Sequence, residues 1–597
     1  MGKLQKTRDE IETKYTWDLT LIYKTDAYFE KDYERVSKEI NDITRYKGIL
    51  VKNASNLLGY LKLSNELERK LYKLYYYANL KNDQDTTNTK YQAMLGKVKN
   101  LLTKFEELDA YAQPELMSID YSIIEKYYEE EKELKEYEFV LSNLFRFKKH
   151  ILSKEVEEVL SSLSNSLNNS SETYELLTDS DMKFGKILDE NNEEVELTES
   201  NYSVFLHSKD RRVRKEAFNK ILTTYGEYKN TISSTFAGNV DTLTTLAKLK
   251  KYDSSLEAAL FSDNVDKEVY NNLIKTVKDN LNVLYKYFKL KKDFLKLDEF
   301  HLYDQYVDLV EENTKQYTFL EAKDLVIEAL SVLGEDYIKN LNKAFDERWI
   351  DVYNNKGKRG GAYSSGFYDT KPYVLLNYEG TINDVSTLAH ELGHSMHTYY
   401  SCLNNPYQYS SYKIFVAEVA STVNELLLNF HLLNKGSKED KKYILSNLMN
   451  LFKATIYRQT MFAEFERDMH NLKEQGGVLT NEVLCDNYYK LNLDYFGPDV
   501  VVDDEIKYEW ERIPHFYYNF YVYKYAIGLS CACYIVDNIL NKKEYALENY
   551  LKFLSSGGSD YPINELKIAG IDVTKKDVIE SAIKMFDNFI EQFKELM

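Results

Sequence analysis

The chain has little of what marks several large classes of protein. Only six prolines and 22 glycines occur in 597 residues, which excludes a collagen-like or low-complexity polypeptide. No stretch approaches 18 uncharged apolar residues, so we expect no membrane-spanning helix. Residues Met1 to Trp17 alternate in charge and contain no apolar core, so we expect no secretory signal.

The chain has no excess of positive charge, and it has few cysteines. The 77 Lys and Arg residues face 96 Asp and Glu residues, which gives a net charge of −19. Proteins that bind nucleic acid neutralise phosphates with a basic surface, so we expect no nucleic-acid partner. The four cysteines, Cys402, Cys485, Cys531 and Cys533, have the spacing of neither an ordinary disulfide pair nor a zinc ribbon. We therefore expect reduced cysteines in a cytoplasmic protein.

What the chain does have is long helical spacing. Only Pro114 precedes Pro372, and the first 370 residues are rich in Lys, Glu, Leu and Tyr at helical intervals, so the fold class is predicted to be mainly α. Residues 182–197 break the pattern and predict a β-hairpin. This break divides the chain into an N-terminal helical region, 1–200, and a second region, 201–597. Residues 373–378 follow Gly and Pro punctuation and predict a strand.

The most informative segment follows that strand. Residues 390–394 read His390-Glu391-Leu392-Gly393-His394, an H-E-x-x-H pattern. Histidines at positions i and i+4 of a helix point the same way, so both imidazoles can bind one metal ion. Thr381 followed by Asp384 resembles a capping box just upstream, and the apolar residues of the segment fall on the face opposite the histidines. The segment is therefore predicted to be a helix that presents two metal ligands.

A third ligand is predicted 24 residues beyond His394. Glu418 lies with Ser421, Thr422 and Glu425 on the polar side of an otherwise apolar helical segment. Two histidines and one carboxylate, with water in the fourth position, form a set typical of catalytic zinc. In that setting Glu391 is not a ligand but is predicted to act as the general base that takes the proton of the water.

Three neighbours of these ligands have weaker predictions. His397 shares the face of the metal-binding histidines, and we expect it to line the wall of the site. Glu425 and Asp384 are candidates to accept the free N–H of a ligand histidine. Plain surface charge is the alternative for both acids.

Two other metal sites use related patterns, and the sequence argues against both. A metzincin needs Gly at position 397 and His at position 400, but the chain has His397 and Tyr400. A di-iron bundle needs a second E-x-x-H, and no other histidine has Glu three residues before it.

An aromatic segment near the C-terminus offers hydrogen-bond donors. If a helix begins after Pro514, Tyr518, Tyr521 and Tyr525 share one face headed by His515. On the same assumption Tyr517 and Tyr523 diverge from that face. Phenolic O–H groups can stabilise the oxyanion of a tetrahedral intermediate. Core packing is the other interpretation, since the chain contains 53 tyrosines, and spacing alone leaves both open.

Taken together, these motifs resemble oligoendopeptidase F, a relative of thimet oligopeptidase. The resemblance covers nearly the whole chain, and its segments are residues 17–19, 361–364, 375–378, 390–397, 415–422 and 515–521.

The resemblance implies a helical clamshell with a deep central channel and a small sheet near the zinc site. It implies a cytosolic zinc endopeptidase that cleaves short oligopeptides, with region 201–597 as the catalytic part. One zinc ion would be held by His390, His394 and Glu418, with Glu391 as the catalytic residue.

Further roles also follow from the resemblance. His515, Tyr518 and Tyr521 would be catalytic residues. Tyr525, Tyr363, Leu375 and Asn377 would bind substrate. The strand at 373–378 would pair with the substrate backbone, which would explain tolerance of many peptide sequences.

Two alternatives remain open on the sequence. A helical zinc carboxypeptidase shares H-E-x-x-H but binds the terminal carboxylate of its substrate. A non-catalytic helical binding protein would retain the motif as a relic, but the intact Glu391 and the presence of all three ligands argue against it.

Overall fold

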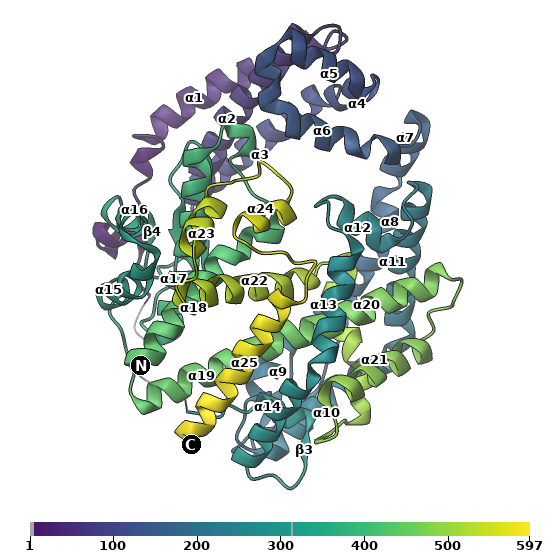
Figure 1. The fold of residues 1–597 in the computed structure, drawn as a ribbon, viewed down its shortest axis with the longest axis vertical. Helices are drawn as coiled ribbons and strands as arrows, with labels where there is room; N and C mark the ends of the chain where they lie inside the picture. Colours follow the sequence, from purple (N-terminus) through teal and green to yellow (C-terminus); the bar gives the residue numbers. More distant parts are fainter. Residues whose placement is uncertain (1–4, 312–314) are drawn as a thin grey trace. The chain divides into compact units, whose positions relative to one another are not determined.

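The computed structural model describes residues 5–311 and 315–597. Helices dominate (Figure 1). The strands of this part of the chain form three small sheets of two or three strands. The mainly helical fold class is therefore confirmed. Within the described residues, no helix is long and apolar enough to cross a bilayer.

The chain forms two compact units, and each is assembled from three segments. The first unit contains residues 1–149, 314–431 and 535–570, and the second contains 150–313, 432–534 and 571–597. This division does not follow the boundary expected at residue 200, because the chain passes repeatedly from one unit to the other. The clamshell and its channel concern the placement of one unit relative to the other, and they stay a prediction.

The first unit is a set of helices around one three-stranded sheet. Its helices are α1 (Asp26–Glu39), α2 (Ala54–Gln84), α3 (Thr89–Asp109), α4 (Ala112–Met117), α5 (Tyr121–Glu130), α6 (Glu138–Arg146), α15 (Phe319–Leu330), α16 (Glu335–Asp346), α17 (Ile382–Asn404), α23 (Ala546–Leu554) and α24 (Pro562–Ile568). Helix α18 (Ile414–Lys435) begins in this unit.

The sheet of the first unit has the strand order β4-β6-β5. Strand β6 (Tyr373–Leu375) pairs in parallel with β4 (Ile350–Asp351) and antiparallel with β5 (Tyr363–Ser365). The strand predicted at 373–378 is thus confirmed for residues 373–375, and it is the central strand. All three of its residues are fully buried, as expected for a strand covered on both faces.

Helix α17 begins where the sequence predicts. Thr381 is the N-cap, its hydroxyl accepts from the Asp384 N–H at 3.2 Å, and the Asp384 carboxylate accepts from the Thr381 N–H at 2.8 Å. This reciprocal capping box satisfies two of the backbone donors that a helix start leaves unpaired. Val385, Leu388 and Leu392 are completely buried on the apolar face of the helix.

The second unit is also helical and contains the other two small sheets. Its helices are α7 (Lys154–Ser162), α8 (Ser164–Leu176), α9 (Glu199–Leu206), α10 (Arg211–Glu227), α11 (Lys229–Leu249), α12 (Ser255–Phe261), α13 (Lys267–Asp279), α14 (Leu281–Phe294), α19 (Lys438–Phe452), α20 (Gln459–Glu474), α21 (Asn481–Phe496) and α25 (Asp577–Leu596). Helix α22 (Tyr523–Leu540) begins in this unit.

The hairpin predicted at 182–197 is confirmed. Strands β1 (Lys186–Leu188) and β2 (Glu194–Glu196) pair antiparallel, with Ile187 opposite Val195. The hairpin lies inside the second unit, so it does not mark a division of the chain. Strands β3 (Phe300–His301) and β7 (Val500–Val501) form the remaining parallel pair.

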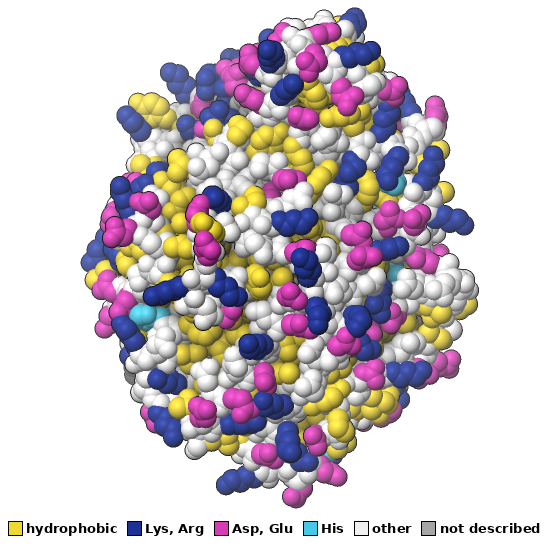
Figure 2. Space-filling model, viewed as in Figure 1, with side chains coloured by type: hydrophobic (Ala, Val, Ile, Leu, Met, Phe, Trp, Pro, Cys, Tyr) yellow, Lys and Arg dark blue, Asp and Glu magenta, His cyan; other side chains and the backbone are white. Residues whose placement is uncertain are grey.

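Surface charge agrees with the composition. On the face drawn in Figure 2, acidic and basic side chains are interspersed. Mixed charge of this kind gives no basic stripe on that face of the kind that tracks a phosphate backbone.

Candidate active site

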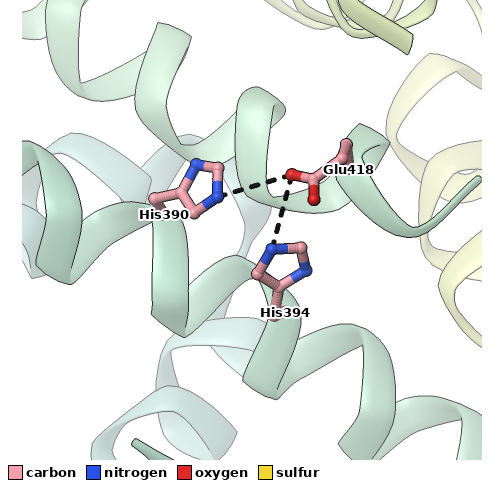
Figure 3. A group of neighbouring side chains, drawn as sticks. All are labelled: His390, His394 and Glu418. Carbon is pink, nitrogen blue, oxygen red and sulfur yellow. Dashed lines mark ion pairs between the residues drawn. The ribbon is translucent and has the colours of Figure 1, made fainter. Parts of the chain in front are cut away.

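The H-E-x-x-H histidines and Glu418 meet at one point in the first unit. His390 Nε2 lies 3.4 Å and His394 Nε2 lies 3.5 Å from the same oxygen, Glu418 Oε2. Figure 3 shows both rings on α17 turned toward the carboxylate on α18. One ligand atom from each residue lies within 4.8 Å of the others, so the three side chains can hold a single metal ion.

Gly393 explains why α18 can come so close to α17. A Cβ atom at this position would lie 2.5 Å from the Cα of Ser421 and 2.6 Å from the carbonyl oxygen of Ala420. Both contacts are to backbone, which cannot move aside as a flexible side chain can. The absence of a side chain at 393 therefore lets α18 bring Glu418 to the two histidines.

The electrostatics of the cluster favour positive charge at the meeting point. Hydrogen bonds with His390 and His394 hold the pKa of Glu418 far below its ordinary value, against the effect of burial. Burial lowers the pKa of His390, but hydrogen bonds to Glu418 and Glu425 outweigh it and raise the pKa to about 10. Two imidazole nitrogens and one carboxylate oxygen match the donor set of catalytic zinc sites.

Glu425 lies behind the first histidine, as one of the two predicted partners. Its Oε2 is 3.3 Å from His390 Nδ1, and its Oε1 accepts a hydrogen bond of 3.2 Å from Ser386. A carboxylate in this place fixes the orientation of the ring and leaves Nε2 facing the metal position. The same expectation for Asp384 is wrong, because its carboxylate accepts from the cap of α17 instead.

Glu391 lies on α17 between the two histidines and is only 7% exposed. Burial raises the pKa of its carboxyl group, while the charges of His390 and His394 oppose that effect. The helix here is tied to strand β5, because Ser395 donates to the Glu391 carbonyl at 2.9 Å and its hydroxyl lies 2.8 Å from that of Ser364. These contacts fix the backbone that carries Glu391 against the edge of the sheet.

His397 does not line an open wall, and that expectation is wrong. The side chain is 1% exposed and stacks on Tyr412 with ring centroids 3.7 Å apart. Phe553 of α23 packs on it at 5.3 Å. Burial lowers the pKa of His397 to about 3, so the ring is neutral at physiological pH. Helical spacing gives its direction correctly but cannot show that Tyr412 and Phe553 cover it.

Strand β6 cannot pair with a peptide backbone, so that expectation is also wrong. Both of its edges are occupied, by β4 and by β5, and Leu375 is fully buried. Asn377 donates to the carbonyls of Arg359 and Gly361 and so holds the loop before β5. The strand at the edge of the sheet is β5, where Tyr363 is half-buried and donates to Asp83 at 2.7 Å.

The aromatic segment of the second unit is not the helix expected after Pro514. A short 3₁₀ turn covers Pro514–Tyr517, and α22 begins only at Tyr523. Asn519 and Phe520 both have left-handed backbones, with φ of 51° and 58°. Two such residues in succession end a right-handed helix. The Phe520 ring is buried, and its N–H donates to Glu466 at 2.7 Å.

The irregular backbone nevertheless gathers the predicted side chains. The His515 ring lies 5.5 Å from the ring of Tyr518 and 6.0 Å from that of Tyr525, and Tyr521 lies 5.3 Å from Tyr525. Tyr518 is 49% exposed, and burial lowers the pKa of His515.

Tyr517 and Tyr523 diverge from this group, as expected. Tyr517 stacks on Tyr174 at 4.4 Å, and Tyr523 is buried beside Tyr270.

Comparison with known proteins decides the family. Residues 204–585 match the model of peptidase family M3, and residues 115–184 match the model of oligopeptidase F. The chain belongs to peptidase family M3. It is a metallo-endopeptidase, and the resemblance to oligoendopeptidase F drawn from the motifs is confirmed. The alternative of a non-catalytic binding protein is accordingly wrong.

Three relatives support the assignment of this M3 peptidase. Oligopeptidase PepF of Bacillus subtilis is 43% identical over 99% of this chain and 88% of its own length. The crystal structure of a candidate peptidase from Chlamydophila abortus has a TM-score of 0.94 and 38% identity, covering 99% of this chain and all of the other. Oligoendopeptidase-F from Enterococcus faecium has a TM-score of 0.73 and 35% identity, covering 96% and 99%.

Sequence reasoning missed four residues that support the predicted site residues of the M3 peptidase. Gly393 lies inside the motif, and a glycine within a helix is the sequence signal that could have indicated close packing against another helix. The Ser364–Ser395 contact joins segments whose pairing only the fold reveals. Glu466 supports the aromatic segment from a helix that starts 55 residues earlier than Pro514 and has no motif of its own.

Proposed function

We propose that this M3 peptidase is a zinc-dependent endopeptidase that hydrolyses short oligopeptides in the cytoplasm. The observation that carries the proposal is the convergence of His390, His394 and Glu418 on one point, with Glu391 on the same turn of helix. The names of the full-length relatives, oligopeptidase and oligoendopeptidase, support the substrate class.

The metal would be held by His390 Nε2, His394 Nε2 and the carboxylate of Glu418. Zinc held by these residues would supply a Lewis acid, which would lower the pKa of a water molecule and polarise the carbonyl of the scissile bond. Glu425 keeps the His390 ring in the orientation that this set requires.

Glu391 would take the proton from the attacking water and pass it to the nitrogen of the leaving amine. A general base works best when its pKa approaches the working pH, and burial moves the pKa of Glu391 in that direction. The contacts of Ser395 and Ser364 hold the same turn of α17 against β5, so the carboxyl group starts from a fixed backbone.

Strand β5 would bind the peptide. Within the described part of the chain, β5 pairs along one edge only, with β6, and its three residues are partly exposed. An extended peptide that adds to such an edge is held through main-chain hydrogen bonds, which tolerate many side chains. This assignment replaces the pairing expected for Leu375 and Asn377.

The side chains of His515, Tyr518 and Tyr521 would stabilise the oxyanion, with Tyr525 contacting substrate. Their clustering supports a shared role, since the two neighbouring tyrosines 517 and 523 are committed to packing instead. A phenol or imidazole donor aimed at the developing negative charge accelerates hydrolysis without changing charge itself.

A peptide blocked at both ends tests the proposal against the zinc carboxypeptidase alternative. The purified protein is incubated with an internally quenched peptide of about ten residues that carries an acetyl group and a C-terminal amide. We expect internal cleavage that a chelator abolishes and that added zinc restores. Cleavage only of peptides with a free C-terminus would favour the carboxypeptidase, and activity that survives chelation would refute the metal mechanism.

A further inference from the structure

A cavity of about 280 Å³ lies inside the second unit. Helices α9, α14, α20 and α21 supply much of its wall, and none of its lining residues belongs to the proposed active site. Its volume is near the lower end of the range for small-molecule sites, roughly 300–1,000 Å³.

The cavity is lined by both buried aromatic residues and exposed residues. Phe288 and Phe496 stack at 5.1 Å in its lining, and both are buried. Tyr202 is buried in the wall. Ser203 and Ala454, which also line the cavity, are exposed. A small molecule can therefore reach an aromatic interior from solvent.

Two arginines line the cavity, and both are already neutralised. Arg458 donates to Glu509 at 2.8 Å, and Arg512 donates to Glu199 at 2.6 Å. Both acids are thereby engaged, so neither is free to receive an additional positive charge.

Lys453 is different from the arginines. Among the described residues it forms no ion pair with a carboxylate, and its ammonium group lies 5.0 Å from the centre of the Tyr306 ring. Burial, followed by the charge of Arg458, lowers the pKa of Lys453 to about 7. The charges of Asp308 and Glu509 oppose this shift without overcoming it. A ligand carboxylate in direct contact with the ammonium group would therefore stabilise its charged form further.

Tyr457 supplies a second unsatisfied group. It is 1% exposed, lines the cavity, and its hydroxyl has no hydrogen-bond partner in the described protein. A buried hydroxyl without a partner costs about 1–3 kcal/mol, so such groups usually serve a ligand or a water molecule.

The backbone that carries these two residues is itself unusual. Lys453–Arg458 forms a π-helical turn between α19 and α20. The wider turn places Lys453, Ala454, Tyr457 and Arg458 together on the cavity wall. Single π turns inside α-helices are uncommon and are found often at functional sites.

We propose that this cavity is a binding site for a small aromatic carboxylate that carries no ammonium group. Its carboxylate contacts the ammonium group of Lys453 and the hydroxyl of Tyr457. Its ring lies among Phe288, Phe496 and the neighbouring tyrosines. An ammonium group on the ligand is disfavoured, because Glu199 and Glu509 are held by the two arginines.

The probe that tests this site is 3-phenylpropionate, measured by isothermal titration calorimetry on the full-length protein. We expect binding at one site, also in protein stripped of metal by a chelator, which separates the cavity from the proposed zinc site. We expect 3-phenylpropanamide and phenylalanine each to bind at least about tenfold more weakly, since one lacks the negative charge and the other adds a positive one.

Variants locate the binding within the molecule. Lys453→Met removes the charge at similar length and is expected to weaken binding at least about tenfold, whereas Lys438→Met, at an exposed position of α19, changes nothing. Tyr457→Phe keeps the ring and is expected to weaken binding about three- to tenfold. It tests the site even if Lys453→Met fails to fold.

Four results would each overturn the proposal. They are no binding at millimolar 3-phenylpropionate, unchanged affinity in folded Lys453→Met or in Tyr457→Phe, equal affinity for the amide or for phenylalanine, and loss of binding on metal removal.

Discussion

Helices α17 and α18 hold His390, His394 and Glu418 by regular spacing, whereas the segment 514–525 holds its aromatic side chains by an irregular backbone. In the first case every predicted ligand follows from helical periodicity and one close helix contact at Gly393. In the second, two left-handed residues and a buried acid, Glu466, determine which rings meet.

The difference separates two kinds of precision. In a regular helix the hydrogen-bonded backbone fixes the position of each residue relative to its neighbours, so side chains for a metal ion are placed accurately. An irregular segment depends on partners from elsewhere in the chain, so its geometry is sensitive to changes at those partners. The comparison can be tested by removing supports from each region in turn.

The largest effect is expected at Glu391. Glu391→Gln removes the carboxyl group proposed to accept the proton but keeps its size, so kcat should fall by about 10²–10⁴-fold. Zinc content, measured by metal analysis, should stay at the wild-type level because Glu391 is not one of the proposed ligands. Full activity in a folded, zinc-loaded variant would refute the assigned general base.

The next largest effect is expected among the tyrosines. Tyr518→Phe and Tyr521→Phe each remove one phenolic hydroxyl, and loss of a proposed oxyanion donor should lower kcat by about 10²–10³-fold. The matched control is Tyr517→Phe, whose ring stacks on Tyr174 and whose hydroxyl pairs with Thr235, and which should leave kcat unchanged. Equal effects in all three variants would assign these tyrosines to packing.

Glu425 and Asp384 provide a matched pair in the regular region. Glu425→Ala should lower zinc affinity about 10- to 100-fold, since it frees the His390 ring. Asp384→Ala should leave zinc affinity unchanged and lower the free energy of unfolding by about 1 kcal/mol, through loss of the capping box. Competition with a chromogenic chelator measures the first effect, and denaturant unfolding measures the second. The reverse pattern would contradict the positions described here for the two acids.

The smallest expected effect is on the pH dependence of stability, and it arises from Glu466, which accepts a hydrogen bond from Phe520 in the irregular segment. Burial raises the pKa of its carboxyl to about 8, against an ordinary value of 4.5. Between pH 4.5 and 8 the folded protein therefore keeps a proton that the unfolded chain has lost, so the stability from this group is complete below pH 4.5 and declines as pH rises toward 8.

Glu466→Gln should remove that dependence. The amide keeps an acceptor for the Phe520 N–H and cannot ionise, so the Tm of the variant relative to wild type should rise between pH 5 and pH 8. Thermal unfolding at four pH values gives the comparison, with the exposed Glu482→Gln as control. A Tm difference that does not vary with pH would show that Glu466 is ionised throughout.

The same contrast explains what the sequence could predict. Local sequence patterns predict three features correctly. They are the cap at Thr381, the shared face of His390 and His394, and the polar side of α18. The burial of His397 depends on Tyr412 and on Phe553, more than 150 residues away in the chain, so no local pattern shows it. The central position of β6 depends in the same way on β4 and β5.

The aromatic segment shows the opposite limit. Its composition identified the relevant side chains, but the predicted helix was wrong. The Phe520 N–H donates to Glu466, a residue outside the segment, so the segment alone did not show this contact. The chemical types of the histidine and tyrosine side chains made them candidates. Contacts with residues distant in the sequence determine how these side chains are arranged. The division of the chain into two units, each of three segments, escapes a linear reading for the same reason.

The absence of a side chain at Gly393 limits which substitutions this enzyme can accept during evolution. Any larger residue there presses on the backbone of α18 at Ser421, although it touches neither the metal ligands nor the substrate. A single apolar substitution could therefore silence the enzyme while every polar group of its chemistry stays in the sequence. Fewer residue types are therefore tolerated at the two x positions of H-E-x-x-H in this chain than the pattern implies. An intact pattern alone does not guarantee a working site.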